Sequence, residues 1–153
     1  MYTRYEITGK FEEPADCNAL LYAPLSGTLS YRQSRSYEFD FGGPVDRLTE
    51  FVRKCLLDEI SQDLSTGAEP WSDFAFVLDY GMKPGALDLE KEAVLNYYRS
   101  LEDPGFELES LAIRHRIYVF GEASKQVVQQ FERDIVNRAI HNWNIQEKSL
   151  AAC

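Results

Sequence analysis

A strand–glycine–helix pattern occurs twice in the chain, about half a chain length apart. The strand Arg35–Phe41, with the sequence RSYEFDF, is followed by glycine and then by a segment with helical spacing of apolar residues. The strand Arg114–Phe120, with the sequence RHRIYVF, is followed in the same way. This repeat predicts two units, each with a strand, a crossover, a second strand and a helix, which is the element order of a ferredoxin-like unit. The alternative is that all strand–helix units look alike and that no duplication underlies the similarity.

Apolar spacing predicts three helices, because residues three and four apart share one helix face. These helices are expected over Val45–Leu64, Asp88–Leu101 and Ser124–Ala139, with Asp88 and Ser124 as N-cap residues. Alternation of apolar and polar residues predicts strands over Arg4–Ile7, Tyr37–Phe41, from Ser72 to Tyr80, over Glu109–Phe120 and over Trp143–Ile145. Between Glu12 and Ser34 we expect a short helix in PADCNALLYA and a strand in TLSYRQ.

The expected architecture is α+β, with two tandem ferredoxin-like units and antiparallel sheets that are joined or packed together, with helices on one face. The expected boundaries are 1–70 for a degenerate first unit, 71–147 for the second unit and 148–153 for a tail. Phe131 and Val94 are expected to be buried against the sheet of the second unit.

Charge and composition exclude several classes of function. The 153-residue chain has 16 Lys and Arg against 25 Asp and Glu, a net charge of −9, so the cationic stripe of a nucleic-acid surface is not expected. No apolar run approaches the roughly 20 residues that span a bilayer, and the N-terminus has no apolar signal segment. The three cysteines, Cys17, Cys55 and Cys153, are far apart and predict reduced thiols, with no metal site and no cofactor. We expect a cytoplasmic protein.

The segment from Trp71 onward resembles a known family. FAFVLDYGMKPGALDLEKEAVLNYYRSL is similar to the opening of the small S subunit of phosphoribosylformylglycinamidine synthase, in which a strand, a Lys-x-Gly-Val-Leu-Asp-Pro turn and a helix follow one another. The residues in register with that pattern are Lys83, Gly85, Leu87, Asp88, Ala93 and Val94. FELESLAIRHRIYVF resembles the long second strand of the family, and VVQQFERDIVNRAIHNWNI resembles its second helix and closing strand. The sequence departs from the family pattern at Leu89, Lys91, Arg114-His115 and Arg138.

The resemblance implies a function as well as a fold. The chain would be a fused pseudo-dimer of the small subunit, without catalytic residues, that bridges the ATP-using synthase subunit and the glutaminase subunit in purine biosynthesis. Such a chain is expected to be a monomer or weak dimer when alone. The departures leave open a second class, a free-standing ferredoxin-like module that binds a small ligand or another protein. An autonomous hydrolase that uses His115 or His141 is the third possibility.

Five residues are candidates for binding a ligand or a partner: Lys83, Asp88, Arg114, His115 and Arg116. Lys83 precedes a helix start, where a phosphate or carboxylate binds well, but Asp88 as the N-cap already explains that position. His115 falls in phase with the core-facing residues of its strand. Arg114 and Arg116 fall on the opposite face with Tyr118 and Phe120, as either a partner interface or a solvated surface.

Overall fold

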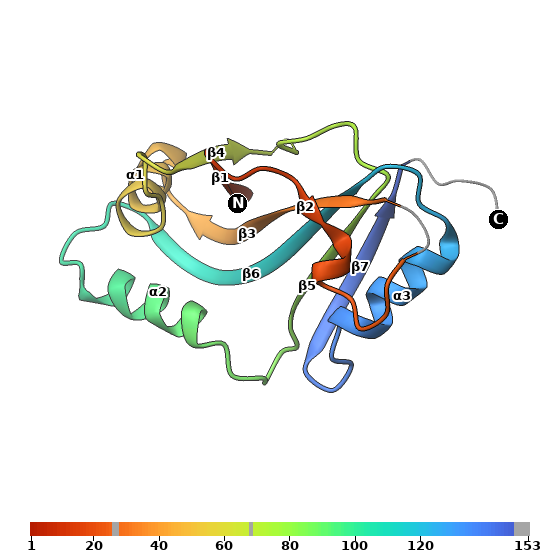
Figure 1. The fold of residues 1–153 in the computed structure, drawn as a ribbon. Helices are drawn as coiled ribbons and strands as arrows, with labels where there is room; N and C mark the ends of the chain where they lie inside the picture. The colour runs from red at the N-terminus through yellow and green to blue at the C-terminus, as the bar shows by residue number, and fades with distance from the viewer. Residues whose placement is uncertain (26–27, 68, 149–153) are drawn as a thin grey trace. The chain divides into compact units, whose positions relative to one another are not determined.

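The computed structural model describes residues 1–25, 28–67 and 69–148 (Figure 1). Most of the expected tail, with Cys153, lies outside these residues. The strands are β1 Tyr2–Gly9, β2 Ala15–Asp16, β3 Ser30–Gly42, β4 Gln62–Thr66, β5 Phe76–Met82, β6 Glu107–Phe120 and β7 His141–Glu147. The helices are η1 Cys17–Ala19, a single 3₁₀ turn, and the α-helices α1 Val45–Cys55, α2 Leu89–Ser100 and α3 Lys125–Ile135.

The strands form one seven-stranded antiparallel sheet in the order β4-β1-β3-β6-β5-β7, with β2 paired to β3. The α+β class predicted from the sequence is therefore confirmed. The chain divides into two compact units, and each unit takes segments from both halves of the sequence. The long strands β3 and β6 each contribute residues to both units. Among the described residues, no helix has the length and apolar character needed to cross a membrane.

Unit 1 contains residues 1–11, 35–70 and 87–114, with α1 and α2 (Figure 1). In β1 and β3, Tyr5 lies opposite Tyr37, and the Tyr5 ring meets Phe39 edge-on at 5.8 Å. The buried core residues are Tyr5, Ile7, Tyr37, Phe39, Phe41, Leu48, Phe51, Val52, Val94, Phe106, Leu111 and Ile113. Val94 is buried as predicted, but it packs in this core, most of whose residues come from the first half of the sequence.

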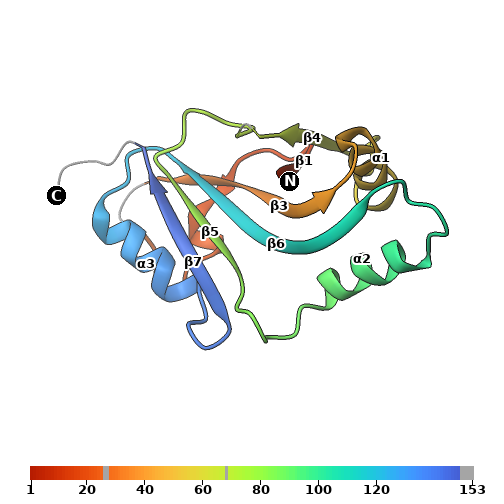
Figure 2. The same cartoon turned by 180° about the vertical axis from the view of Figure 1, so that it is seen from behind.

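Unit 2 contains residues 12–34, 71–86 and 115–153, with η1 and α3, and α3 packs against β5 (Figure 2). The Phe131 ring of α3 meets the Phe76 ring of β5 edge-on, with centroids 5.4 Å apart. The buried core residues are Cys17, Leu29, Ala75, Phe76, Leu78, Ile117, Val119, Ala123, Val128, Phe131 and Val136. A second cluster is formed by Phe74, Val77 and Tyr118, with Trp71 and Phe120 packed against it. Val77 and Tyr118 alternate with the core residues along β5 and β6.

The predicted helix over Val45–Leu64 is wrong in its second half, because α1 ends at Cys55. The Asp58 carboxylate accepts hydrogen bonds from the Ile60 backbone N–H at 3.1 Å and from the Ser61 hydroxyl at 2.8 Å. These bonds close a turn, and the hydrogen bond from Ser61 lowers the pKa of Asp58 below its usual value. After the turn, β4 pairs with β1.

The other two helices begin where the sequence predicts. The Asp88 carboxylate accepts the Lys91 backbone N–H at 3.1 Å, which is an N-cap hydrogen bond. Ser124 occupies the N-cap position of α3, but its side chain makes no capping hydrogen bond. α2 ends at Ser100, next to the predicted end, and α3 ends earlier than predicted, at Ile135.

Candidate functional site

Lys83 and Asp88, two of the predicted binding residues, make structural contacts. Lys83 donates from Nζ to the Arg138 carbonyl at 2.7 Å, and its backbone N–H donates to the Ile140 carbonyl at 2.8 Å. Both bonds fix the turn between α3 and β7 to the end of β5. Asp88 uses its carboxylate as the cap of α2, which is the structural role that the sequence predicts for it.

Arg116 is not on an outward surface, and that prediction is wrong. Its side chain is 5% exposed, and its Nη1 lies 2.6 Å from Oδ2 of Asp79 on β5. Its guanidinium also lies over the Tyr118 ring, 5.5 Å from the centroid, and Tyr118 itself is fully buried. The physical reason is that this second face of the sheet in unit 2 is covered by the cluster that contains Phe74, so a charge there must be paired. Arg114, by contrast, is half-buried.

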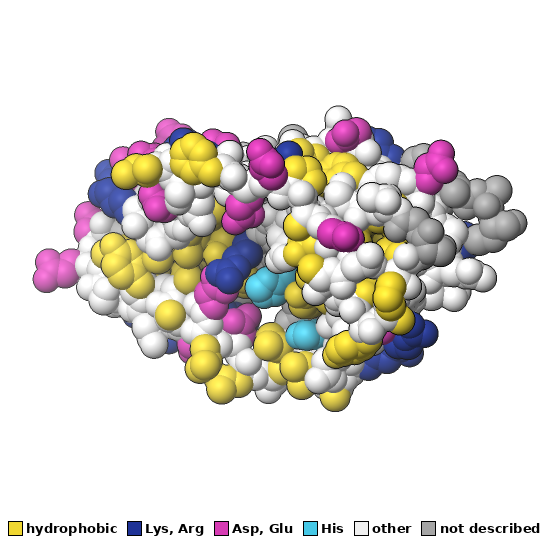
Figure 3. All heavy atoms as spheres, viewed as in Figure 1, with side chains coloured by type: hydrophobic (Ala, Val, Ile, Leu, Met, Phe, Trp, Pro, Cys, Tyr) yellow, Lys and Arg dark blue, Asp and Glu magenta, His cyan; other side chains and the backbone are white. Residues whose placement is uncertain are grey.

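Both histidines of the chain contact one tyrosine. The His115 ring stacks on Tyr80 with centroids 5.3 Å apart and an interplanar angle of 25°. The His141 ring lies 5.1 Å from the same tyrosine at 57°. Figure 3 shows the two histidine side chains reaching the surface near one another. The phase of His115 with its neighbours was correctly assigned from the sequence, but its grouping with Tyr80 and His141 was missed. The facing positions of Met82 and His141 in β5 and β7 create this grouping, and no local pattern predicts them.

His141 also closes the turn that follows α3. Its Nδ1 accepts the Asn137 backbone N–H at 3.1 Å, so in this state Nδ1 carries no proton. Burial lowers the pKa of His141 below its usual value. Among the described residues, no group of three or more His, Cys, Asp and Glu side chains is placed to hold a metal ion. Both histidines therefore pack against Tyr80, and His141 also fixes the turn after α3.

Lowering the pH from about 7.5 to about 5.5 is expected to reduce the free energy of unfolding through His141. Its pKa is lower in the folded protein than in the unfolded chain, so the unfolded chain takes up the proton first and stability falls as the pH decreases. Urea titrations at both pH values measure this change, and His141→Gln is expected to flatten it. An equally steep pH dependence in His141→Gln would contradict the assignment. The contribution of Asp58 has the same sign, but it is lost only near and below its ordinary pKa of 3.8, outside this window.

The cysteines give no reactive site in the described residues. Cys17 is fully buried, and burial, with the nearby Asp16 charge, raises the pKa of its thiol to about 12. Burial also raises the pKa of Cys55, which packs against the core of unit 1. Because the thiolate is the reactive form, both residues act as small apolar side chains.

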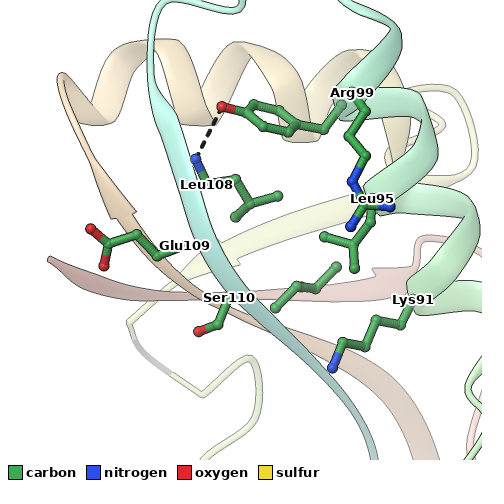
Figure 4. Close-up of a pocket in the computed structure, with 8 residues that line it drawn as sticks. Lys91, Leu95, Arg99, Leu108, Glu109 and Ser110 are labelled. Carbon is green, nitrogen blue, oxygen red and sulfur yellow. Dashed lines mark hydrogen bonds between the residues drawn. The ribbon is translucent and has the colours of Figure 1, made fainter.

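A pocket of about 250 Å³ in unit 1 lies between α2 and the N-terminal part of β6 (Figure 4). Lys91 and Leu95 point from α2 toward β6, the Arg99 side chain runs along the helix toward Leu95, and Glu109 points away from the helix (Figure 4). The Tyr98 hydroxyl accepts the Leu108 backbone N–H at 3.1 Å and donates to the Phe106 carbonyl at 2.7 Å. We call this pocket the α2–β6 groove; its lining residues are Lys91, Leu95, Tyr98, Arg99, Leu108, Glu109, Ser110 and Leu111.

No pattern within one element predicts the α2–β6 groove, because a helix and a strand line it jointly. The spacing of Lys91, Leu95 and Arg99 at four-residue intervals was the available signal, since such residues share one helix face. Comparisons with known proteins do not assign it a role: no protein-family model, curated protein or solved structure matches the chain.

Proposed function

We propose that the chain is a non-catalytic structural subunit of phosphoribosylformylglycinamidine synthase that bridges the ATP-using synthase subunit and the glutaminase subunit. The order of elements supports this proposal. The first half contains the long strand β3 of 13 residues and then α1 of 11 residues, and the second half contains β6 of 14 residues and then α3 of 11 residues. In each half a shorter strand precedes the long strand and another follows the helix. This is the order that the resemblance to the small S subunit implies.

The observation that carries the proposal is a reciprocal pair of glycine contacts. Gly43 after β3 and Gly121 after β6 have similar positive φ angles, 108° and 113°. A Cβ on Gly43 would lie 3.2 Å from the Cα of Phe106, the residue directly before β6. A Cβ on Gly121 would lie 2.8 Å from Cδ2 of Leu29, the residue directly before β3. Each glycine therefore follows one long strand and lies close to the residue that precedes the other long strand. Such reciprocal contacts are characteristic of a two-fold pair, so they support two fused ferredoxin-like copies.

A fused pair supplies internally the contact that two separate copies make between chains. The proposed subunit is therefore a monomer or weak dimer when alone. Its role is to offer surface to two enzyme subunits, and its own residues take no part in glutamine hydrolysis or ATP use.

Reconstitution with the two partner subunits is expected to show that the chain is needed for the glutamine-dependent reaction. The isolated chain should turn over neither glutamine nor ATP, and the amidine product should form efficiently only when all three chains are mixed. Product formation is measured with and without the chain, and a pull-down from native extract identifies its partners by mass spectrometry. Recovery of neither subunit, or turnover of glutamine or ATP by the purified chain alone, would overturn the proposal.

A second candidate, a free-standing binding module, is favoured by the α2–β6 groove. That groove presents Lys91 and Arg99 at its margin, on a chain with a net charge of −9. A native pull-down that recovers a different partner through the groove would favour this second candidate.

A further inference from the structure

The N-terminal part of β6 has an open lateral edge. β6 has 14 residues and its neighbour β5 has seven, so β5 can cover only part of it. The Ala75 backbone N–H donates to the Val119 carbonyl, which places β5 beside the C-terminal part of β6. Among the described residues, no strand therefore lies beyond Glu107–Leu111 on that side. An unpaired strand edge is a template for another extended segment.

The open edge faces the α2–β6 groove. The Tyr98 hydroxyl of α2 bonds to the Leu108 N–H and the Phe106 carbonyl, which shows that the backbone groups at the start of β6 point toward α2. Tyr98 occupies only this end of the edge. Leu108 and Leu111 both pack against the unit 1 core although they are three positions apart, so the regular alternation of β6 breaks at Glu109–Ser110. Both of these residues are exposed, at the point where the groove is open.

The side chains across the groove have a spacing that fits an extended peptide. Lys91 and Arg99 are eight residues apart on α2, a distance of about 12 Å along the helix axis, and Leu95 lies midway between them. In an extended chain, residues i and i+4 are about 13 Å apart and lie on the same side as residue i+2. Neither Lys91 nor Arg99 makes an ion pair within the described part of the chain, and Arg99 donates from Nη1 to the Asn96 side chain at 3.3 Å. An extended peptide with an acidic side chain at position i, an apolar one at i+2 and an acidic one at i+4 would therefore meet Lys91, Leu95 and Arg99.

We propose that the α2–β6 groove binds an extended segment of a partner protein, which adds to the open edge of β6 and carries two acidic residues four positions apart with an apolar residue midway. Main-chain hydrogen bonds to β6 supply strand pairing, and the α2 side chains select the sequence. This binding requires none of the partners of the proposed subunit, and Lys91, which takes part in it, is one of the positions where the sequence departs from the resembled family.

A fluorescence-anisotropy titration with labelled peptides tests this proposal. The probe is the seven-residue peptide Ser-Glu-Thr-Leu-Thr-Glu-Ser, in a panel whose two glutamates are two, four or six positions apart. We expect the tightest binding at a separation of four, and at least about tenfold weaker binding to a Lys91→Glu, Arg99→Glu double variant. A Lys54→Glu, Lys125→Glu double variant has the same change in net charge outside the groove and should bind as the wild type does. Circular dichroism checks that both variants are folded.

Three further results decide whether the peptide binds as a strand. A peptide with proline in place of its first threonine should lose binding, because proline cannot donate to the β6 edge. Hydrogen exchange at the amides of residues 109–111 should slow when the wild-type peptide is bound. Equal binding of the proline peptide, displacement of the peptide by dodecanedioate at a similar concentration, or no binding of any panel member at about 1 mM would each overturn the proposal. The dodecanedioate result would indicate a site for small dicarboxylates.

Discussion

Replacing Phe131 by alanine is expected to reduce the free energy of unfolding by about 3–5 kcal/mol. Phe131 is fully buried, and its ring meets Phe76 edge-on at 5.4 Å in the core of unit 2. The substitution removes a large apolar surface from a close-packed core and leaves a cavity that the neighbouring β-strand cannot fill without moving. Urea or guanidinium unfolding, followed by circular dichroism and by tryptophan fluorescence, measures the loss.

Ile60→Ala is the matched control for this experiment. Ile60 lies in the segment Val45–Leu64 that the apolar spacing predicts to be a helix, but it is 81% exposed in the turn that follows α1. Its truncation should change the free energy of unfolding by no more than about 0.5 kcal/mol. A loss below about 1 kcal/mol for Phe131→Ala, or losses of similar size in both variants, would contradict the core described here.

Local patterns were sufficient to predict most of the secondary structure. The apolar alternation of Tyr37, Phe39 and Phe41 marks the buried face of β3, and Asp88 marks the start of α2 through a bond within one turn. The same kind of evidence failed after Cys55, because Ile60 and Leu64 continue the helical spacing by coincidence. What ends α1 there is a turn closed by the Asp58 carboxylate, followed by pairing of β4 with the distant β1. The apolar spacing contains no signal for pairing between strands that lie so far apart in the sequence.

The candidate site was less predictable, because alternation assigns a residue to a face of a strand but does not show what covers that face. Arg116 was correctly placed opposite the core-facing residues of β6, yet the face on which it lies is buried. Trp71 and Phe74, from the segment before β5, pack there against Tyr118. The groove beside α2 was not predictable for a similar reason. It depends on a contact between two elements, the hydroxyl of Tyr98 with the backbone of β6.

Arg116→Met is expected to reduce the free energy of unfolding by about 3–5 kcal/mol, because it removes one member of the buried ion pair between Arg116 and Asp79. Nη1 of Arg116 and Oδ2 of Asp79 are 2.6 Å apart, and their side chains are 5% and 13% exposed. Asp79→Leu should be destabilising for the same reason, since it removes the other member of this ion pair. Equilibrium unfolding of both variants at neutral pH measures these losses.

The double variant Asp79→Leu, Arg116→Met distinguishes a paired charge from simple loss of packing. It removes both charges and keeps apolar volume on the face that Tyr118 and Phe74 already occupy. A buried ion pair replaced by apolar residues of similar size is often no less stable, because the cost of taking two charges out of water disappears with them. The double variant should therefore lose less stability than either single variant, which corresponds to a coupling energy above about 3 kcal/mol. Additive losses would mean that the two residues stabilise the protein independently, and the burial of Arg116 would then need a cause other than its pairing with Asp79.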